Sequence, residues 1–439
     1  MLTYLSLILT TFSLIGGTAM LGNTDAGNEK EARIQIVTET ADEAGSAETQ
    51  DLEEKGLENS EELEGKEQEK TKSTKEIQDN AADEEEKGGN ASGKGRKEGT
   101  SGLEENARGD GAFVYRKETR VPGKVTLSFA GDISFAEGYA NMVNYHNRGD
   151  DITQCIMPDV IERMDSADIM MINNEFTYSR RGAPLSGKTF TFRAIPETAA
   201  NLNLLSVDIV SLANNHVYDY GETALIDTLD TLNQYGIPYV GAGRNLEEAK
   251  KIVYFRAGGI KIAFVSATQV ERSYVFTKEA TNTSAGVLRT FSPDKFLEVI
   301  RQAEETSDFV VVYVHWGTEG VNQFEADQQL LGHQYIDAGA DLVIGDHPHC
   351  LQGVEYYRGV PIFYSLGNYW FNSRTLDTGL VEADISSEGL LELRFVPCLQ
   401  QSCRTSLVTD PGQQLRVFQF LEAISANASV DEHGVIREK

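Results

Sequence analysis

An abrupt change of composition near Phe113 constrains the fold of this chain more than any other feature. No Phe, Tyr or Trp occurs between Leu21 and Ala112, and residues 29–110 hold 25 acidic side chains against 12 basic ones. Such a segment buries too little apolar surface to offset the conformational entropy that folding removes. We therefore expect residues 23–112 to form a disordered acidic linker and the folded part to begin at Phe113.

The net charge of the chain limits the classes of molecule that we expect it to bind. The 439 residues carry a formal net charge of −29, and the chain stays acidic when the linker is left out. Proteins that bind nucleic acid without sequence preference neutralise phosphates with Lys and Arg. We therefore expect no nucleic-acid partner.

The first 22 residues contain an apolar run. Leu2 to Gly22 is free of charged side chains and, at about 1.5 Å rise per residue, is just long enough to cross a bilayer. A signal peptide would carry a basic leading region and a small-residue cleavage site, yet no Lys or Arg precedes Lys30. We interpret residues 1–22 as an uncleaved membrane anchor or a poorly cleaved signal, with a buried core helix as the alternative. The folded part would then face outward from the cell membrane, or be secreted if the run is cleaved.

Beyond Phe113, short apolar runs alternate with helical patterns, which predicts α/β layers. Buried strands are predicted over 125–130, 168–172, 207–212, 260–267, 309–314, 342–344 and 362–365, and helices over 222–235 and 293–305. Strand patterns over 353–357, 362–365, 380–385 and 390–396 follow one another without a helix, which adds an antiparallel element. We expect one domain over 113–397 and a C-terminal extension over 398–439 that packs on it.

Four cysteines are too few and too scattered for a disulfide scaffold, and no C-x-x-C motif occurs. Only Cys398 and Cys403 are close enough in sequence to suggest a disulfide, which an oxidising compartment would permit.

Polar residues cluster directly after the predicted strands, where open α/β sheets bind ligands. They are Asp132, Glu175, Asn215, His216, His315, His347 and His349. A lone histidine is more often a core or surface residue, but four of them beside two carboxylates indicate a metal site. The set exceeds the four ligands of one tetrahedral ion, so we expect two divalent ions, with Mn, Zn and Fe as candidates.

Two adjacent cations can clamp a phosphoryl group and suit the hydrolysis of phosphoesters. Such a pair requires a bridging carboxylate, for which Glu175 is the best candidate. The His347-Pro-His349 spacing is expected to place two imidazoles on the same side of an extended segment.

The order of the strand-end motifs resembles that of the capsule-synthesis CapA family, also called the poly-γ-glutamate synthesis protein family. The motifs are Gly131-Asp132, Asn173-x-Glu175, Ala213-Asn-Asn-His216, His315-Trp-Gly-x-Glu319, His347-Pro-His349 and Ser365-Leu-Gly-Asn368. The resemblance extends from about Val125 to Val396. It implies a calcineurin-type, metallophosphatase-like domain, a four-layer α/β/β/α sandwich with two central sheets and a dinuclear site between loops.

The resemblance also implies roles for individual residues. Asp132 would bind one ion and Glu175 would bridge both. Asn215, His315 and His347 or His349 would complete the pair. His216 would act as the general acid that protonates the leaving oxygen.

Two departures from the family pattern concern the ions, and a third concerns the pocket rim. Metallophosphatases carry a His two residues after the first Asp, where this chain has Ser134. Asp346 stands where the family pattern Gly-His-His-Pro-His has its first His. Gly320 replaces a Tyr. The ion near Ser134 is therefore expected to be held more weakly.

Three further residues are substrate-binding candidates. Arg193 could grip an anionic group with two hydrogen bonds, although a surface ion pair is the alternative. Glu319 could line the site and orient His315, or simply face solvent. Asn368 lies at another predicted strand end and is expected to line the pocket.

Two functions from different classes remain open. The first is a membrane-anchored, metal-dependent hydrolase or transferase acting on a phosphate or amide linkage in an extracellular polymer. The second is a non-catalytic component of a capsule or poly-γ-glutamate synthase, in contact with membrane-bound synthase subunits. A soluble phosphodiesterase that acts on a small phosphate-containing substrate is the third reading. Participation in capsular polymer synthesis or export at the cell surface is the biological role that we favour.

Overall fold

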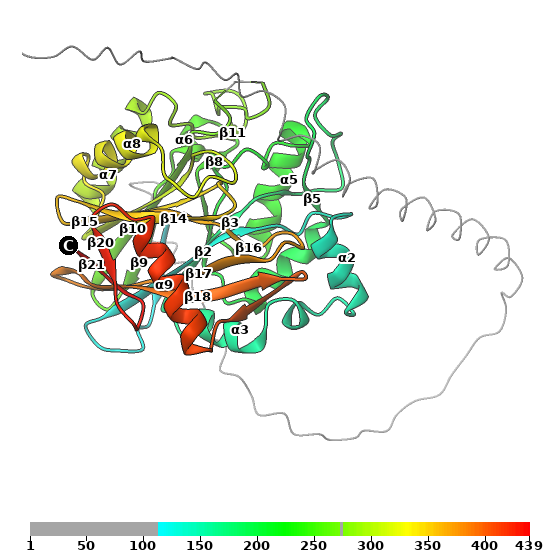
Figure 1. Cartoon of the computed structure of the whole chain (residues 1–439). Helices are drawn as coiled ribbons and strands as arrows, with labels where there is room; N and C mark the ends of the chain where they lie inside the picture. Colours follow the sequence, from blue (N-terminus) through cyan, green and yellow to red (C-terminus); the bar gives the residue numbers. More distant parts are fainter. Residues whose placement is uncertain (1–112, 273–274) are drawn as a thin grey trace, which may run out of the picture. The chain divides into compact units, whose positions relative to one another are not determined.

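The computed structural model describes residues 113–272 and 275–439 (Figure 1). The predicted anchor and the predicted acidic linker lie outside these ranges. Among the helices of the described ranges, none is long and apolar enough to span a membrane.

One sheet has seven strands. In spatial order they are β1 (Phe113–Lys117), β9 (Val253–Ala257), β10 (Ile260–Thr268), β12 (Phe309–His315), β13 (Leu342–Asp346), β15 (Val360–Leu366) and β14 (Leu351–Tyr357). The central strands β10, β12, β13 and β15 run parallel, whereas β14 pairs antiparallel with β15. Parallel strands that are buried on both faces have continuous apolar sequences. For this reason the apolar runs of the sequence predicted these central strands.

The second sheet has ten strands. Its main path is β20 (Ala428–Val430), β21 (Val435–Glu438), β18 (Gly389–Gln401), β17 (Leu376–Ser386), β2 (Val125–Ile133), β3 (Ile169–Asn174), β6 (Ile209–Ser211) and β7 (Tyr239–Val240). Beside this path, β16 (Asn368–Trp370) pairs with β2, and β19 (Arg404–Leu407) pairs with β18. The long β17–β18 hairpin is the predicted antiparallel element. The expected domain boundary at Pro397 falls within β18, and the elements after it continue the same sheet.

Short elements complete the topology. Two-stranded pairs are formed by β11 (Gly286–Val287) with β8 (Ala242–Gly243) and by β4 (Thr177–Tyr178) with β5 (Arg193–Ala194). The helices are α2 (Ala140–Asn147), α3 (Pro158–Asp165), α4 (Ala200–Leu204), α5 (Gly221–Gln234), α6 (Leu246–Ala249), α7 (Asp294–Thr306), α8 (Ala326–Asp337) and α9 (Pro411–Ala423). The helices predicted over 222–235 and 293–305 correspond to α5 and α7.

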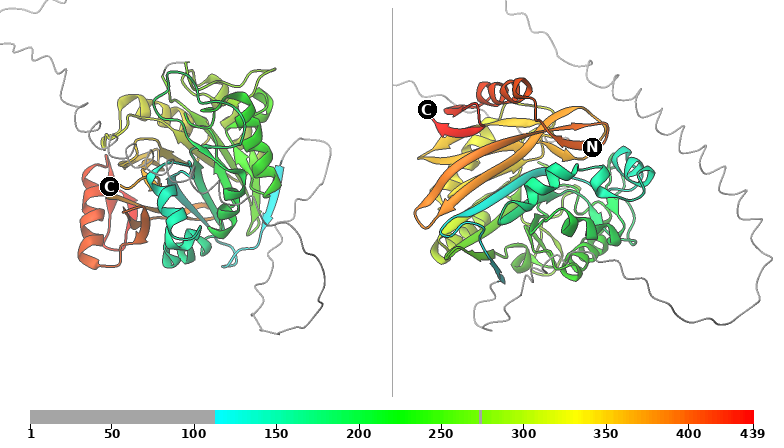
Figure 2. Two further views of the ribbon diagram at one scale, coloured as in Figure 1. Left: turned by 90° about the vertical axis from the view of Figure 1, so that its right-hand side faces the viewer. Right: turned by 90° about the horizontal axis from the view of Figure 1, so that it is seen from below.

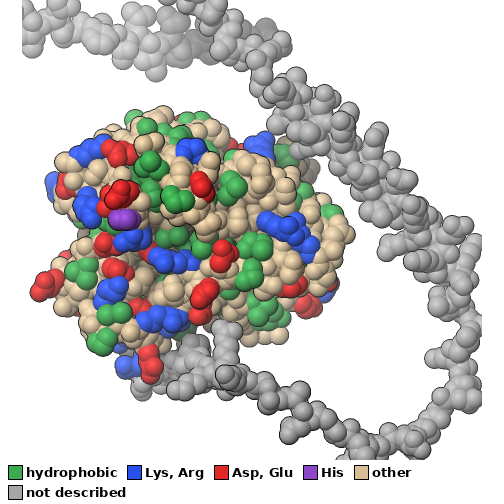
Figure 3. Space-filling model, turned by 60° about the horizontal axis from the view of Figure 1, so that its bottom comes forward, with side chains coloured by type: hydrophobic (Ala, Val, Ile, Leu, Met, Phe, Trp, Pro, Cys, Tyr) green, Lys and Arg blue, Asp and Glu red, His purple; other side chains and the backbone are tan. Residues whose placement is uncertain are grey.

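Three apolar clusters hold the layers together. The cluster between the two sheets includes Phe129 of β2, Tyr313 of β12 and Phe395 of β18. A second cluster packs α3 and α5 against the outer face of the ten-stranded sheet, and a third packs α7 and α8 against the outer face of the seven-stranded sheet. Figures 1 and 2 show α7 and α8 on one outer side of the stacked sheets and α3 and α5 on the other, whereas α9 packs on the cluster between the sheets. In the face shown in Figure 3, acidic and basic side chains are interspersed.

The suggested Cys398–Cys403 disulfide is wrong, because both cysteines are free. Cys398 lies opposite Leu407 in the β18–β19 hairpin, whereas Cys403 lies beyond the last pair of that hairpin, Gln401 and Arg404. At about 3.4 Å per strand residue, the two Cα atoms are separated by more than the roughly 7 Å that a disulfide can bridge.

Candidate metal centre

The candidate site lies where the carboxyl ends of strands from both sheets meet. Asp132 is near the end of β2 and Glu175 directly follows β3 in one sheet, while His315 ends β12 in the other. Side chains from the two sheets come into close contact here, with His315 Nε2 2.8 Å from Asn215 Oδ1 and His349 Nδ1 2.9 Å from Asp132 Oδ2. The strand ends therefore bring residues about 200 positions apart in the sequence into one cluster.

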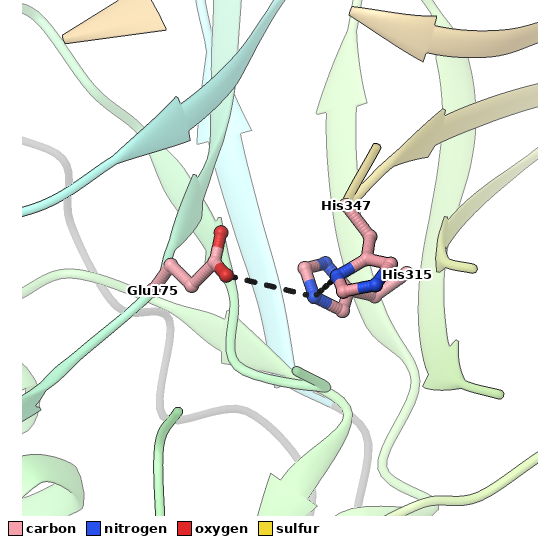
Figure 4. Close-up of side chains that lie close together, drawn as sticks. All are labelled: Glu175, His315 and His347. Carbon is pink, nitrogen blue, oxygen red and sulfur yellow. Dashed lines mark hydrogen bonds and ion pairs between the residues drawn. The ribbon is translucent and has the colours of Figure 1, made fainter. Parts of the chain in front are cut away.

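Glu175 lies close to several histidines of this cluster, and Figure 4 shows its carboxylate turned toward His315 and His347. Its Oε1 lies 3.7 Å from His315 Nε2 and 3.9 Å from the Nε2 atoms of both His216 and His349. The carboxylate is fully buried, and Oε1 accepts no hydrogen bond from any residue that the structure describes. A buried carboxylate oxygen without a donor is costly unless a cation binds it.

Two groups of potential ligands share Glu175. One comprises Glu175, His315 and His347, and the other comprises Asp132, Glu175 and His349, with the ligand atoms of each group within 4.8 Å of one another. Ligand atoms at about 2.0–2.2 Å from a tetrahedral ion lie about 3.3–3.6 Å apart. The 3.1 Å between His347 Nδ1 and His315 Nε2 lies just below this range, and the 3.7 Å from His315 Nε2 to Glu175 Oε1 lies just above it. The residues present therefore fit the binding of divalent metal.

Protonation favours the same interpretation. Burial lowers the pKa values of His315 and His347 well below the ordinary value, so both imidazoles are neutral and able to ligate. Burial, together with the charges of Asp132 and Asp346, raises the pKa of Glu175 well above its ordinary range. Carboxylates crowded in this way repel one another, and bound cations would remove the repulsion.

The predicted extended geometry of the His347-Pro-His349 segment is wrong. The backbone bends, with positive φ angles of 97° at His347 and 56° at His349, in a region that residues with side chains rarely adopt. Both imidazoles nevertheless reach the cluster, with ring centroids 5.8 Å apart. Backbone strain of this kind is typical of functional sites.

His216, the predicted general acid, is held on its far side. Its Nδ1 donates to Asp219 Oδ2 at 2.7 Å, which leaves Nε2 facing Glu175. Asp219 also accepts hydrogen bonds from Lys188 Nζ and from the backbone N–H of Phe192. This carboxylate therefore fixes the orientation of the imidazole.

A cavity of about 590 Å³ opens on this side of the cluster. Its lining includes His216 and His347 together with Lys188, Phe190 and Glu319. Glu319 lies in the pocket, but it is Asp346 whose carboxylate contacts His315 Nδ1, at 2.8 Å. Arg193 is not among the residues lining this cavity, and its guanidinium lies over the ring of Tyr220.

Three contributors to the cluster escaped the sequence reasoning. Asn173 donates to both Asp132 and Glu175, Asp219 holds His216, and Asp346 holds His315. Asn173 belongs to one of the strand-end motifs, Asp219 follows His216 by three residues, and Asp346 was noted only as a departure from the family pattern. The sequence signal that could have identified these three residues is that each is polar and lies close in sequence to an assigned ligand.

Comparison with known proteins identifies the family. Residues 126–373 match the family model described as "Bacterial capsule synthesis protein PGA_cap". The chain belongs to this family. It is 31% identical over 325 residues to the capsule biosynthesis protein CapA of Bacillus anthracis, an alignment that covers 70% of this chain and 77% of the relative.

Two further relatives agree with this membership. The PGA biosynthesis protein CapA of Bacillus subtilis is 33% identical, over 65% of this chain and 76% of the relative. A probable polyglutamine synthesis accessory protein of Mycobacterium tuberculosis is 30% identical, over 53% of this chain and 66% of the relative. Among solved structures, a 5'-nucleotidase from Candida albicans is similar at a TM-score of 0.34 and 10% identity, over 64% of this chain and 53% of that one, which is too weak to support an argument.

Proposed function

We propose that this protein takes part in capsule or poly-γ-glutamate synthesis at the cell surface, as a hydrolase that uses two divalent ions. Membership of the capsule synthesis family supports the biological role. The two stacked sheets with outer helices support a metallophosphatase-like, four-layer arrangement. An anionic polymer or a phosphate-containing small molecule would be the substrate, and membrane-bound synthase subunits would be the partners.

One observation is the main support for the proposed dinuclear centre. Glu175 Oε1 is buried without a hydrogen bond and is shared by two ligand groups, one with His315 and His347 and the other with Asp132 and His349. A carboxylate placed between two such groups is what a bridging ligand requires. Mn, Zn and Fe all accept this mixture of imidazole and carboxylate ligands.

The chain's own residues would carry the remaining chemistry. Bound ions would act as Lewis acids on the scissile group. The cavity would hold the substrate against the cluster, with His216 on its wall. His216, oriented by Asp219, would give the Nε2 proton of its doubly protonated imidazole to the leaving group, and the Asp219 carboxylate would stabilise that imidazolium.

Metal analysis of the full chain is the decisive experiment. The purified wild-type protein should contain about two equivalents of Mn, Zn or Fe by plasma mass spectrometry, and Asp132→Ala and His347→Ala should each lose metal. Loaded protein should then hydrolyse phosphoesters or γ-glutamyl amides, and His216→Ala should retain metal but lose activity. A wild-type protein that neither contains nor takes up metal would overturn this proposal.

A scaffold is the second candidate, favoured by Ser134. Because this position holds a serine, no imidazole is available there to bind an ion. The Ser134 hydroxyl instead accepts a hydrogen bond from the backbone N–H of Ala136. The two functions give opposite results in cells that make capsular polymer. A His216→Ala protein should abolish polymer output if the protein is an enzyme and leave it unchanged if the protein is a scaffold.

A further inference from the structure

Asn368 lies beside the first ligand of the proposed centre. It begins β16, and its Cα is the register partner of Asp132 in the parallel pairing of β16 with β2. The two strands approach closely because Gly131 has no side chain, since a Cβ there would lie 2.0 Å from the carbonyl oxygen of Gly367. Side chains of register partners project from the same face of a sheet, so Asn368 accompanies Asp132.

The amide of Asn368 is buried without partners. The residue is 1% exposed, and neither Oδ1 nor Nδ2 makes a hydrogen bond within the part of the chain that the structure describes. Leaving a buried polar group without a hydrogen-bond partner is costly. The Asn368 amide bears this cost beside residues of the types that bind metals. A ligand that binds the amide would remove the cost.

The neighbours of Asn368 identify which ion it would meet. Asn368 is the register partner of Asp132, and Asp132 Oδ2 lies 2.9 Å from His349 Nδ1. Asn368 is therefore next to both Asp132 and His349, which with Glu175 form one of the two ligand groups. This group has three protein ligands, one fewer than a closed tetrahedral set.

Ser134, where a histidine would complete this group, is committed elsewhere. It is 2% exposed, its hydroxyl accepts from Ala136 N at 3.3 Å, and its carbonyl accepts from Asn141 Nδ2 at 2.6 Å. These contacts hold Ser134 in the turn that follows β2.

We propose that Asn368 Oδ1 is the fourth protein ligand of the ion bound by Asp132, Glu175 and His349. This inference rests on the proposed dinuclear centre and assigns one of its two ions a set of three oxygen donors and one imidazole. Carboxylate and amide oxygens suit Mn²⁺ better than they suit softer ions. The position with Asn368 should therefore prefer Mn²⁺ more strongly than the position with His315 and His347 does.

The test is a Mn²⁺ titration of metal-free, full-length protein, followed by electron paramagnetic resonance and calorimetry. Wild type should bind two equivalents. Asn368→Leu should bind one equivalent as before and the other at least about tenfold more weakly. Asn201→Leu is the matched control, because Asn201 is also buried but lies on α4 and contacts Tyr145. It should bind Mn²⁺ as wild type does.

Asn368→Asp separates ligation from packing. This variant keeps an oxygen at the same place and adds a charge, so it should bind both ions, and Mn²⁺ should raise its Tm by more than it raises that of wild type. The comparison also stands if Asn368→Leu does not fold. Two unchanged equivalents in Asn368→Leu, or an Asn368→Asp protein that Mn²⁺ stabilises less than wild type, would overturn the assignment while leaving the dinuclear centre intact. A wild type that binds no Mn²⁺, Zn²⁺ or Fe²⁺ would overturn both proposals.

Discussion

Asp219 Oδ2 lies 2.7 Å from His216 Nδ1, and this contact determines which nitrogen of the imidazole faces the candidate metal centre. Because the carboxylate accepts, Nδ1 carries the proton and Nε2 is turned toward Glu175, 3.9 Å from Oε1. Lys188 holds the other oxygen of Asp219. The orientation of His216 is therefore set by a residue three positions along the chain and by a lysine from another loop.

Asp219→Asn tests this orientation. Burial lowers the pKa of His216, and the Asp219 charge opposes that effect, so the substitution should lower the pKa further. If His216 is the acid, the basic limb of the kcat/KM profile should move to lower pH, and kcat should fall about 10²-fold or more. The measurement is a pH–rate profile on the phosphoester or γ-glutamyl substrate that the metal-loaded wild type hydrolyses.

Metal content and a second aspartate provide the controls. Asp219→Asn should retain both ions. Asp227→Asn, which alters a carboxylate that contacts Ser179 and Arg181 away from the cluster, should keep the wild-type profile. An unshifted profile in Asp219→Asn would show that His216 is not oriented through this contact.

The sequence predicted most of the buried strands because each is apolar over its whole length. The runs around Val125, Phe309 and Leu342 became central strands, and the polar residues directly after them do meet at one edge. Parallel strands place their carboxyl ends together, so residues far apart in the sequence could be assigned to one site. The predicted membership of the capsule synthesis family is confirmed by a match over residues 126–373, a range that contains the strand-end motifs.

The details that failed depend on backbone geometry and on neighbours across the fold. No periodicity reveals that His347 and His349 adopt positive φ, or that Cys398 and Cys403 lie too far apart along one hairpin. The pairing of Asp346 with His315 depends on the register of β12 with β13, in which the two residues are partners. The sequence analysis treated Asp346 as the loss of a histidine ligand. In the structure Asp346 contacts His315, a candidate ligand that is retained.

Asp346→Ala should weaken metal binding. Asp346 belongs to neither of the two ligand groups that contain Glu175, so the substitution removes no ligand from them. Asp346 Oδ1 accepts from His315 Nδ1 at 2.8 Å and so leaves Nε2 free to ligate. Loss of such a partner typically lowers metal affinity about 10–100-fold. Competition with a chelator would measure the change.

Asp341→Ala is the matched control for that experiment. Asp341 precedes β13 at the opposite end from Asp346 and accepts from the backbone N–H of Val310. Its removal should lower the free energy of unfolding but leave metal affinity unchanged. Equal metal affinities for wild type and Asp346→Ala would contradict the role given to Asp346.

Glu382→Gln should destabilise the fold at a distance from the candidate site. Arg163 of α3 contacts both oxygens of Glu382 on β17, at 2.6 Å each, and Glu382 is 9% exposed. Because the substitution leaves a half-buried guanidinium without its charged partner, the free energy of unfolding should fall by about 1–3 kcal/mol. Urea denaturation measures the loss, and the exposed Glu388→Gln should change stability by less than about 0.5 kcal/mol.

Lys251 should make stability rise with pH on the alkaline side. Burial lowers its pKa from 10.5 to about 8, and Nζ lies 3.8 Å from the centroid of the Tyr239 ring. A lowered folded-state pKa means that the unfolded chain binds more protons between pH 8 and 10.5, so the lysine's contribution to stability increases as pH rises through that window. The full effect is at most about 3.5 kcal/mol, at about 1.4 kcal/mol per pKa unit.

Lys251→Met isolates that contribution. Buried tyrosines such as Tyr239 also titrate at high pH, but they are common to both proteins, so the difference in unfolding free energy between wild type and Lys251→Met cancels most of their effect. That difference should favour wild type increasingly from pH 8 to 10.5 and be flat below pH 7, where Lys251 is charged in both states. Guanidinium titrations at several pH values would reveal it. A constant difference across the window would mean that the ammonium keeps its ordinary pKa, stabilised over the Tyr239 and Phe113 rings rather than penalised by burial.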